Sequence, residues 1–263
     1  MKNALTTLLK VVIFFVGWAI LATVLPISES SNPAVWRFVA ELMPFLAVVL
    51  CTLVGWLIEG RQLKIVGGIT KSAVGMGLLA GFCWIGSAVG ILLLTGHMTI
   101  DAGPQAVSML WLWFLALFFN TLMQELLVRG YLYRLLQRRA NTVLAALITT
   151  ALFLFCHGGA LEAGWLPCAN IVLMSLLMTA VLEATGSLVA PVLMHFLWNS
   201  IGGIVLGGVS LAEDYPHLYA ITMHGNPLLS GGVFKIEGSA VVLVLNALFF
   251  TGFAVLAWRR VRK

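Results

Sequence analysis

Among the polar residues inside segments of the chain that are otherwise apolar, six have types and spacing that could activate water. They are Gln124, Glu125 and Arg129 in MQELLVRG, His157 in FLFCHGG, and His195 with Asn199 in MHFLWNS. A carboxylate and an imidazole can take a proton from water, and an imidazole and an amide can stabilise the oxyanion that forms when water attacks a carbonyl. Together these residue types predict a hydrolytic site.

Each of these residues also has a purely structural interpretation. Glu125 and Arg129 are four residues apart, so they can form an ion pair within one helix. A single membrane-embedded histidine commonly forms a hydrogen-bonded contact between helices, and this alternative applies to both His157 and His195. The joint occurrence of a carboxylate, two imidazoles and an amide favours the catalytic interpretation, provided that the fold brings them to one depth.

The composition is typical of a membrane protein. Of the 263 residues, 61% are hydrophobic and only 10% are charged, whereas about a quarter of the residues of a soluble domain carry charge. A charged side chain at the centre of a membrane helix costs at least about 2.5 kcal/mol. The few polar residues in such segments are therefore candidates for function.

Eight apolar runs are long enough to cross a hydrocarbon core of about 30 Å, which takes about 20 helical residues. They lie near residues 7–25, 36–58, 73–96, 106–128, 142–160, 166–182, 187–208 and 239–258. We expect an all-α membrane protein, a polytopic bundle of about eight transmembrane helices that forms a single domain over residues 1–263. The longest stretch outside the runs, 208–238, is rich in turn residues and is expected to be a structured outer loop.

The spacing along the chain predicts that the polar residues meet inside the membrane. The fourth helix is expected to continue through YLYRLLQRR to about Arg139, with a turn near residue 141. Glu125 and His157 are each about 16 residues from that turn, which at about 1.5 Å per residue puts both roughly 24 Å along adjacent antiparallel helices. By the same rise, His195 and Asn199 fall at roughly 13–20 Å on one face of the seventh helix.

The distribution of basic residues predicts the orientation. With the N-terminus in the cytoplasm, thirteen of the fifteen Lys and Arg residues lie on the inner side, and only Arg37 and Lys235 lie near the outside. We therefore expect a multi-pass protein of the cytoplasmic (inner) membrane with both termini inside. The net charge of +5 is expected to meet anionic headgroups of the lipid bilayer, and nucleic acid is not an expected partner.

Three of the motifs, in this order, resemble those of the CAAX-protease and bacteriocin-processing (CPBP, Abi) family of intramembrane proteases. That family carries E-E-x-x-x-R, F-x-x-x-H and H-x-x-x-N on three helices, and the counterparts here are QELLVR from Gln124, FLFCH from Phe153 and HFLWN from His195. The resemblance covers about residues 110–205. It implies an endopeptidase, similar to the type II CAAX prenyl endopeptidases, that hydrolyses a peptide bond in a membrane-associated or leader peptide or protein.

The resemblance also implies a role for each residue. The first glutamate of the family motif activates water together with His157, while His195 and Asn199 hold the oxyanion. In this chain Gln124 replaces that first glutamate, and an amide cannot accept a proton near neutral pH. Two outcomes stay open. Glu125, about 100° further round the helix, supplies the base, or Glu125 and Arg129 only stabilise the helix and the fold lacks hydrolytic activity.

Other functions compete with the protease. A non-catalytic membrane partner or immunity protein would use the same helical surface, and Gln124 together with Tyr215, Tyr219 and Phe234 of the outer loop supports it. A proton-coupled transporter that uses Glu125 and the histidines as a relay is less favoured, because no paired, Gly- or Pro-broken apolar segments occur in matching halves.

A zinc ion is a related alternative. Glu125, His157 and His195 would meet the ligand count of a catalytic zinc site, although nothing resembling H-E-x-x-H occurs. The water-based scheme requires no cofactor and is preferred. The four cysteines stand singly inside apolar runs, so neither a disulfide framework nor a thiolate zinc site is expected.

Overall fold

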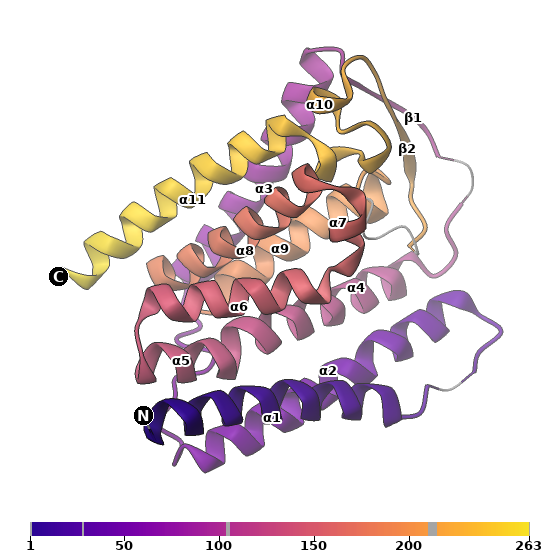
Figure 1. The fold of residues 1–263 in the computed structure, drawn as a ribbon. Coiled ribbons are helices and arrows are strands. Elements are labelled where there is room, and N and C mark those ends of the chain that lie inside the picture. Colours follow the sequence, from indigo (N-terminus) through magenta and orange to yellow (C-terminus); the bar gives the residue numbers. More distant parts are fainter. Residues whose placement is uncertain (1, 28, 104–105, 210–214, 263) are drawn as a thin grey trace. The chain divides into compact units, whose positions relative to one another are not determined.

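The chain forms a largely helical structure, described by a computed structural model for residues 2–27, 29–103, 106–209 and 215–262 (Figure 1). In the described residues, six helices are long and apolar enough to cross a membrane: Ala4–Val24, Pro33–Ile58, Lys71–Leu94, Leu110–Arg139, Trp165–Thr185 and Ala240–Arg260. Two shorter apolar helices are Thr142–Cys156 and Val189–Val205. The prediction of a polytopic all-α membrane protein is confirmed.

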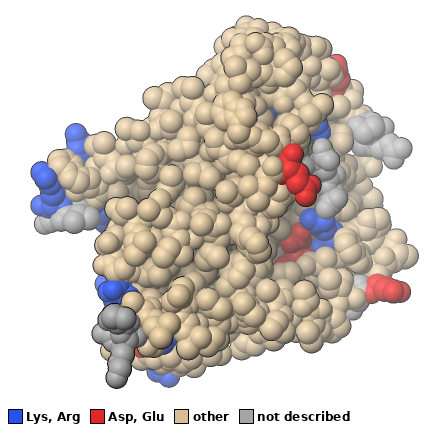
Figure 2. Space-filling model, viewed as in Figure 1, with Lys and Arg blue, Asp and Glu red and all other residues tan. Residues whose placement is uncertain are grey.

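The surface has the character that a lipid environment requires. Most of the face shown in Figure 2 carries no Lys, Arg, Asp or Glu, and large apolar side chains such as Leu94 and Ile69 are 90% and 75% exposed. In water such a surface would promote aggregation, whereas in a bilayer it contacts acyl chains of similar polarity. The protein is therefore a multi-pass membrane protein.

Two of the expected spans are shorter than the sequence predicted. The fifth was expected at 142–160, but its helix ends at Cys156 because His157, with φ −106° and ψ 48°, leaves the helical conformation. The seventh was expected at 187–208, but it consists of Val189–Asn199 followed by a π-helical segment, Ser200–Val205. Apolar runs predict where a segment is buried, and they do not show where the backbone departs from an α-helix.

Two compact units make up the chain. Unit 1 consists of Met1–Gly67 with Met109–Leu152, and unit 2 of Gly68–Ser108 with Phe153–Lys263. The family-like segment predicted at about 110–205 thus contributes to both units. That the two form a single domain stays a prediction.

Unit 1 contains α1 (Lys2–Val24), α2 (Pro33–Ile58), α4 (Leu110–Glu125), the π-helical η1 (Leu126–Leu132), α5 (Tyr133–Arg139) and α6 (Thr142–Cys156) up to residue 152. Helix α2 begins at a sequence-encoded cap, because the Asn32 side chain accepts a hydrogen bond from the Ala34 N–H at 3.0 Å and Pro33 occupies the first turn. Local chemistry therefore fixes where the helix begins.

Tyr131 of η1 is the centre of the packing between α1 and α2. Its ring stacks on Phe14 of α1 with centroids 4.8 Å apart. On its other side it lies so close to Gly55 of α2 that a Cβ at this glycine would come within 2.7 Å of the ring. The missing side chain at position 55 is thus what allows η1 to approach α2.

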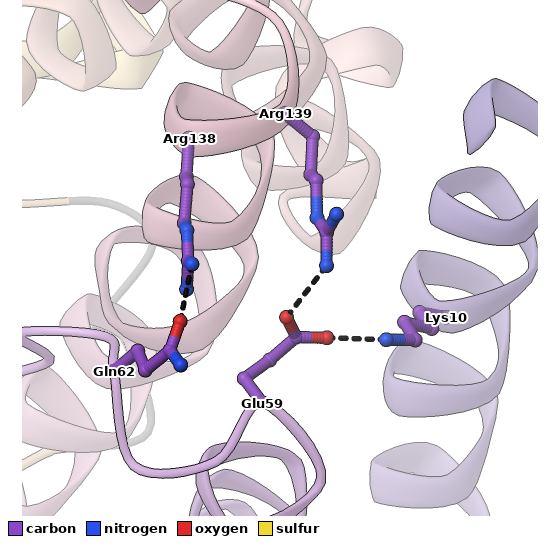
Figure 3. A network of polar contacts seen from close by, with 5 residues as sticks. All are labelled: Lys10, Glu59, Gln62, Arg138 and Arg139. Carbon is purple, nitrogen blue, oxygen red and sulfur yellow. Dashed lines mark hydrogen bonds and ion pairs between the residues drawn. The ribbon is translucent and has the colours of Figure 1, made fainter.

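A polar network connects α1 to the residue after α2 and to the end of α5 in unit 1 (Figure 3). Glu59, the residue after α2, binds Lys10 of α1, and its other carboxylate oxygen accepts from Arg139 Nη2 of α5 at 3.1 Å. The Glu59 side chain is only 2% exposed. Beside it, Arg138 donates to the Gln62 side-chain oxygen. One acid between two cations fixes α1, α2 and α5 at this end.

Unit 2 is built on four helices, α3 (Lys71–Leu94), α8 (Trp165–Thr185), α9 (Val189–Asn199) and α11 (Ala240–Val261), with α7 (Gly158–Ala163) and the π-helical η2 (Ser200–Val205) beside them. Helix α9 lies directly on α3. The two backbones are so close that a Cβ at Gly77 would come within 2.7 Å of the Ala190 carbonyl oxygen. The Trp84 and Trp198 rings then stack with centroids 4.0 Å apart. Small residues thus allow close backbone approach, as is common in membranes.

Two buried asparagines connect the helices of unit 2. Trp84 Nε1 of α3 donates to Asn246 Oδ1 of α11 at 2.8 Å, and Asn246 Nδ2 donates to Asn170 Oδ1 of α8 at 3.2 Å. Asn170 Nδ2 in turn donates to the backbone oxygen of Glu237 at 2.8 Å. These bonds satisfy amides that would be costly to bury alone.

The stretch from 208 to 238 is structured, as expected, although 210–214 lie outside the described residues. It contains β2 (Tyr219–Met223), α10 (Pro227–Ser230), and the 3₁₀ turns η4 (Gly232–Phe234) and η5 (Ile236–Gly238). Strand β2 pairs antiparallel with β1 (Met98–Ala102), with Met98 opposite Met223 and Ala102 opposite Tyr219. This small sheet was not predicted, because its partners are more than a hundred residues apart in the sequence.

We predict that Gly77→Ala destabilises unit 2. The new Cβ would meet backbone atoms of Ala190, at 2.7 Å from the oxygen and 2.9 Å from Cα, and backbone cannot turn aside as a side chain can. Such overpacking typically costs about 1–3 kcal/mol, measurable as a lower Tm in detergent. The matched control is Gly75→Ala on the same helix, where no atom lies within 4 Å. Equal Tm values for the two variants would contradict the packing.

Glu59 is expected to make stability fall on acidification. Burial by itself raises the pKa of its carboxyl, but hydrogen bonds and attraction from Lys10 and Arg139 outweigh burial and hold the pKa below its ordinary 4.5. A carboxyl whose pKa is lowered by folding stabilises the protein above its unfolded pKa, and this contribution is lost as the pH falls through the folded pKa.

The measurement is Tm against pH from 7 down to about 3. Wild type should lose more Tm than Glu59→Gln below about pH 4.5, since the variant has no carboxyl to protonate there. Glu29→Gln, at an exposed position of the same unit, should follow wild type. Parallel curves for wild type and Glu59→Gln would refute the role of this ion pair.

Candidate active site

The polar residues of unit 1 lie where an α-helix becomes π-helical. The apolar helix Leu110–Arg139 reaches Arg139 as predicted, but Leu126–Leu132 are π-helical and Gly130, with φ −76° and ψ −112°, lies outside helical geometry. A π-helical turn changes the direction of the side chains that follow it, and such turns frequently occur at functional sites. Gln124 and Glu125 end the α-helical part.

Glu125 and Arg129 form the ion pair that their spacing allows. Arg129 Nη1 donates to Glu125 Oε1 at 3.0 Å, and both side chains are 0% exposed. Within one turn, each side chain of the pair offsets the charge of the other. A carboxylate can accept several hydrogen bonds. The structural interpretation is therefore correct for this pair, and it is compatible with a second role for Glu125.

Gln124 is the last residue of a chain of hydrogen bonds within unit 1. Its Nε2 donates to Asn120 Oδ1 at 2.6 Å, and Asn120 Nδ2 donates to Glu41 Oε2 on α2 at 2.7 Å. Glu41, which is buried, also pairs with Arg37 Nη2 at 2.8 Å. The amide at position 124 is thus connected to a carboxylate on another helix.

His157 occupies the turn between α6 and α7, and its ring is held by the residue four positions earlier. His157 Nδ1 lies 2.7 Å from the Phe153 carbonyl oxygen, and the two rings are 4.2 Å apart. A carbonyl only accepts, so Nδ1 carries the proton in this bond. In the neutral ring Nε2 then has the lone pair and is the basic nitrogen. The F-x-x-x-H spacing selects the tautomer.

His195 lies on α9, with Asn199 one turn further along the same helix. Phe153 also contacts the His195 ring, in an edge-to-face arrangement with centroids 6.2 Å apart. His195 is only 2% exposed. Unit 2 thus brings the two predicted histidines to one buried aromatic ring.

Each unit assembles part of the predicted site. Unit 1 holds Gln124, Glu125 and Arg129, and unit 2 holds the two histidines and Asn199. Their convergence on one water molecule stays a prediction. Within the described ranges no group of three His, Cys, Asp or Glu side chains is arranged to hold a metal ion. A zinc site formed by Glu125, His157 and His195 likewise remains a prediction.

Glu41 and Asn120 were not predicted as part of the site. Glu41 lies inside the apolar run 36–58 and is buried, so the rule that singled out Glu125 also applies to it. Asn120 lies four residues before Gln124, which puts both on one face of α4. The signal was therefore present in the sequence, but only the packing of α2 against α4 connects the two residues.

We predict that Arg129→Gln costs about 3–5 kcal/mol of stability, because it removes the cation that offsets a fully buried carboxylate. The double variant Glu125→Gln/Arg129→Gln should recover most of that loss, since it removes both charges at once. Unfolding in detergent measures both. If the double variant is less stable than Arg129→Gln, the pair does not compensate as described.

Comparison with known proteins gives one match. Residues 106–201 match the model of the family described as type II CAAX prenyl endopeptidase, Rce1-like. No curated protein and no solved structure matches the chain. The matched segment contains all six predicted site residues, from both units. Over these residues the chain is similar to the Rce1-like type II CAAX prenyl endopeptidases.

Proposed function

We propose that the protein is an intramembrane endopeptidase that hydrolyses a peptide bond in a membrane-associated or leader-bearing peptide or protein. The match of residues 106–201 to the type II CAAX prenyl endopeptidase model supports a protease with a peptide or protein substrate. The observation that carries the proposal is the contact of Phe153 with both histidine rings, because it puts two proton-handling groups against the same buried side chain of unit 2.

In the proposed reaction, Glu125 and His157 activate one water molecule. The His157 Nδ1 bond to the Phe153 carbonyl supports this role, because it leaves the basic Nε2 as the nitrogen that can accept a proton. The water oxygen forms a bond to the substrate carbonyl carbon, and its proton passes to this base. When the tetrahedral intermediate collapses, the C–N bond breaks and the same proton passes to the leaving amine.

His195 and Asn199 stabilise the oxyanion in this scheme. Both side chains can donate hydrogen bonds, from a ring N–H and from the amide Nδ2. Burial of His195 supports the role, because a hydrogen bond to a developing negative charge is stronger where water is excluded.

We further propose that the protein spans the cytoplasmic membrane with both termini inside. The network around Glu59 supports this orientation, because Lys10, Arg138 and Arg139 gather at one end of the unit 1 helices (Figure 3). Basic side chains are retained on the cytoplasmic side, where anionic headgroups stabilise them.

The test compares the membrane peptidome of cells that carry wild-type protein with that of cells that carry His195→Ala, and then cleavage of the identified peptide by purified protein. His157→Ala, His195→Ala and Glu125→Gln, the last alone and with Arg129→Gln, should each lose at least about 100-fold in kcat, because each removes a proton-transfer or oxyanion group. Thermal unfolding checks that each variant is folded.

His224→Ala is the matched control, since this histidine is exposed and bonded to Thr99 rather than to the site. It should cleave like wild type. Full activity of Glu125→Gln/Arg129→Gln would remove Glu125 from the mechanism. If no peptide depends on the histidines while changes at Tyr215 or Phe234 abolish the phenotype, the non-catalytic partner or immunity function, which Gln124 favours, replaces the protease.

A further inference from the structure

The chain Gln124–Asn120–Glu41 has a fixed direction. An ionised carboxylate has no proton to donate, so Glu41 can only accept, and Asn120 must present its Nδ2 to it. Asn120 then has its carbonyl oxygen, Oδ1, directed to position 124, where it accepts from Gln124 Nε2. Each amide orientation therefore follows from the charge at Glu41.

The end of this chain is an acceptor. With Nε2 bound to Asn120, the Gln124 side chain presents its Oε1, which is buried and has no hydrogen-bond partner among the described residues of unit 1. A buried carbonyl oxygen without a partner costs about 1–3 kcal/mol, so it is a site for a donor such as water. A rotated amide would instead present an N–H.

We infer that Glu41 is a positioning residue which, through Asn120, holds the Gln124 amide so that its oxygen accepts a hydrogen bond from the attacking water. The inference rests on the proposed function. One O–H of the water is held by Gln124 Oε1, and the other proton passes to the base formed by Glu125 and His157 while the water oxygen bonds to the substrate carbonyl carbon.

This arrangement accounts for a glutamine where the family motif has a glutamate. A carboxylate offers acceptor oxygens in either orientation, whereas an amide offers one acceptor and one donor. An amide can therefore replace the carboxylate as a water holder only if something fixes its orientation. Glu41 supplies that constraint from α2, where it also pairs with Arg37.

A charge exchange distinguishes this role from a structural ion pair. Arg37→Glu/Glu41→Lys keeps one acid and one base on the same turn of α2, but it puts an obligate donor where the obligate acceptor was. The lysine at position 41 would donate to Asn120 Oδ1, Asn120 would then donate to Gln124 Oε1, and the Gln124 N–H₂ would face the water. We expect kcat to fall on the order of 10- to 100-fold while KM changes little.

Adding Gln124→Glu to this exchanged protein should restore kcat. The new carboxylate accepts from the reversed Asn120 with one oxygen and holds water with the other. Glu41→Gln alone should lower kcat by at least roughly twofold, which is less than the exchange does. A neutral amide at position 41 permits both directions of the hydrogen-bond chain. Glu29→Gln, the same change at an exposed site of unit 1, should behave like wild type.

Wild-type kcat in the exchanged protein would overturn the inference, as would a loss that Gln124→Glu does not restore in a protein that is folded. Should the exchange prevent folding, Asn120→Ala breaks the chain without altering either charge and must lower kcat in the same way. A wild-type protein without hydrolytic activity would instead overturn the proposed function.

A second readout does not depend on activity. In protein labelled with ¹⁵N-glutamine, the side-chain amide signal of Gln124 is identified by its absence in Gln124→Glu. In wild type its hydrogens should exchange slowly, because Nε2 is bonded to Asn120. In the exchanged protein the signal should shift and exchange faster. An unchanged signal would show that Glu41 does not set the amide orientation, whatever reaction the protein performs.

Discussion

The structure depends on one constraint: a polar group inside a membrane segment must find its partner within the protein, because acyl chains offer none. The described helices meet this requirement in pairs and short chains. Arg129 neutralises Glu125 on the same helix, and Asn170 with Asn246 connects α8 to α11. Such bonds help to determine which helices pack together.

Close approach of the backbones, like the polar bonds, holds the helices together. Gly55 admits the Tyr131 ring and Gly77 admits α9, so the helices that carry the candidate residues are held by shape as well as by hydrogen bonds. The departures from α-helical geometry occur beside candidate residues, at η1 after Glu125 and at the turn of His157. These are positions where a regular helix would direct the side chains differently.

The role proposed for Gln124 in the first motif depends on the residues that it contacts. An amide is a poor substitute for a base, but an amide whose orientation is set by an anion is a good acceptor. Glu41 and Asn120 supply that orientation from outside the three recognised motifs. A substitution that looks like a lost function in the motif can therefore be compensated by a residue on a helix that the motif does not include.

Composition and apolar runs by themselves determined the membrane class and the helical fold, because the length of an apolar run and the cost of unbonded backbone leave few alternatives. Residue types and order likewise pointed to the resemblance that residues 106–201 show to the type II CAAX prenyl endopeptidases, and they singled out six candidate residues. Only the tertiary structure decided that α6 ends at Cys156, that Phe153 contacts both histidines, and that Glu41 reaches Gln124. The end of α6 is a local departure of the backbone at His157, which the length of an apolar run does not show. The contact of Phe153 with His195 and the bond of Glu41 to Asn120 join segments distant in the sequence, and periodicity within one segment carries no information about them.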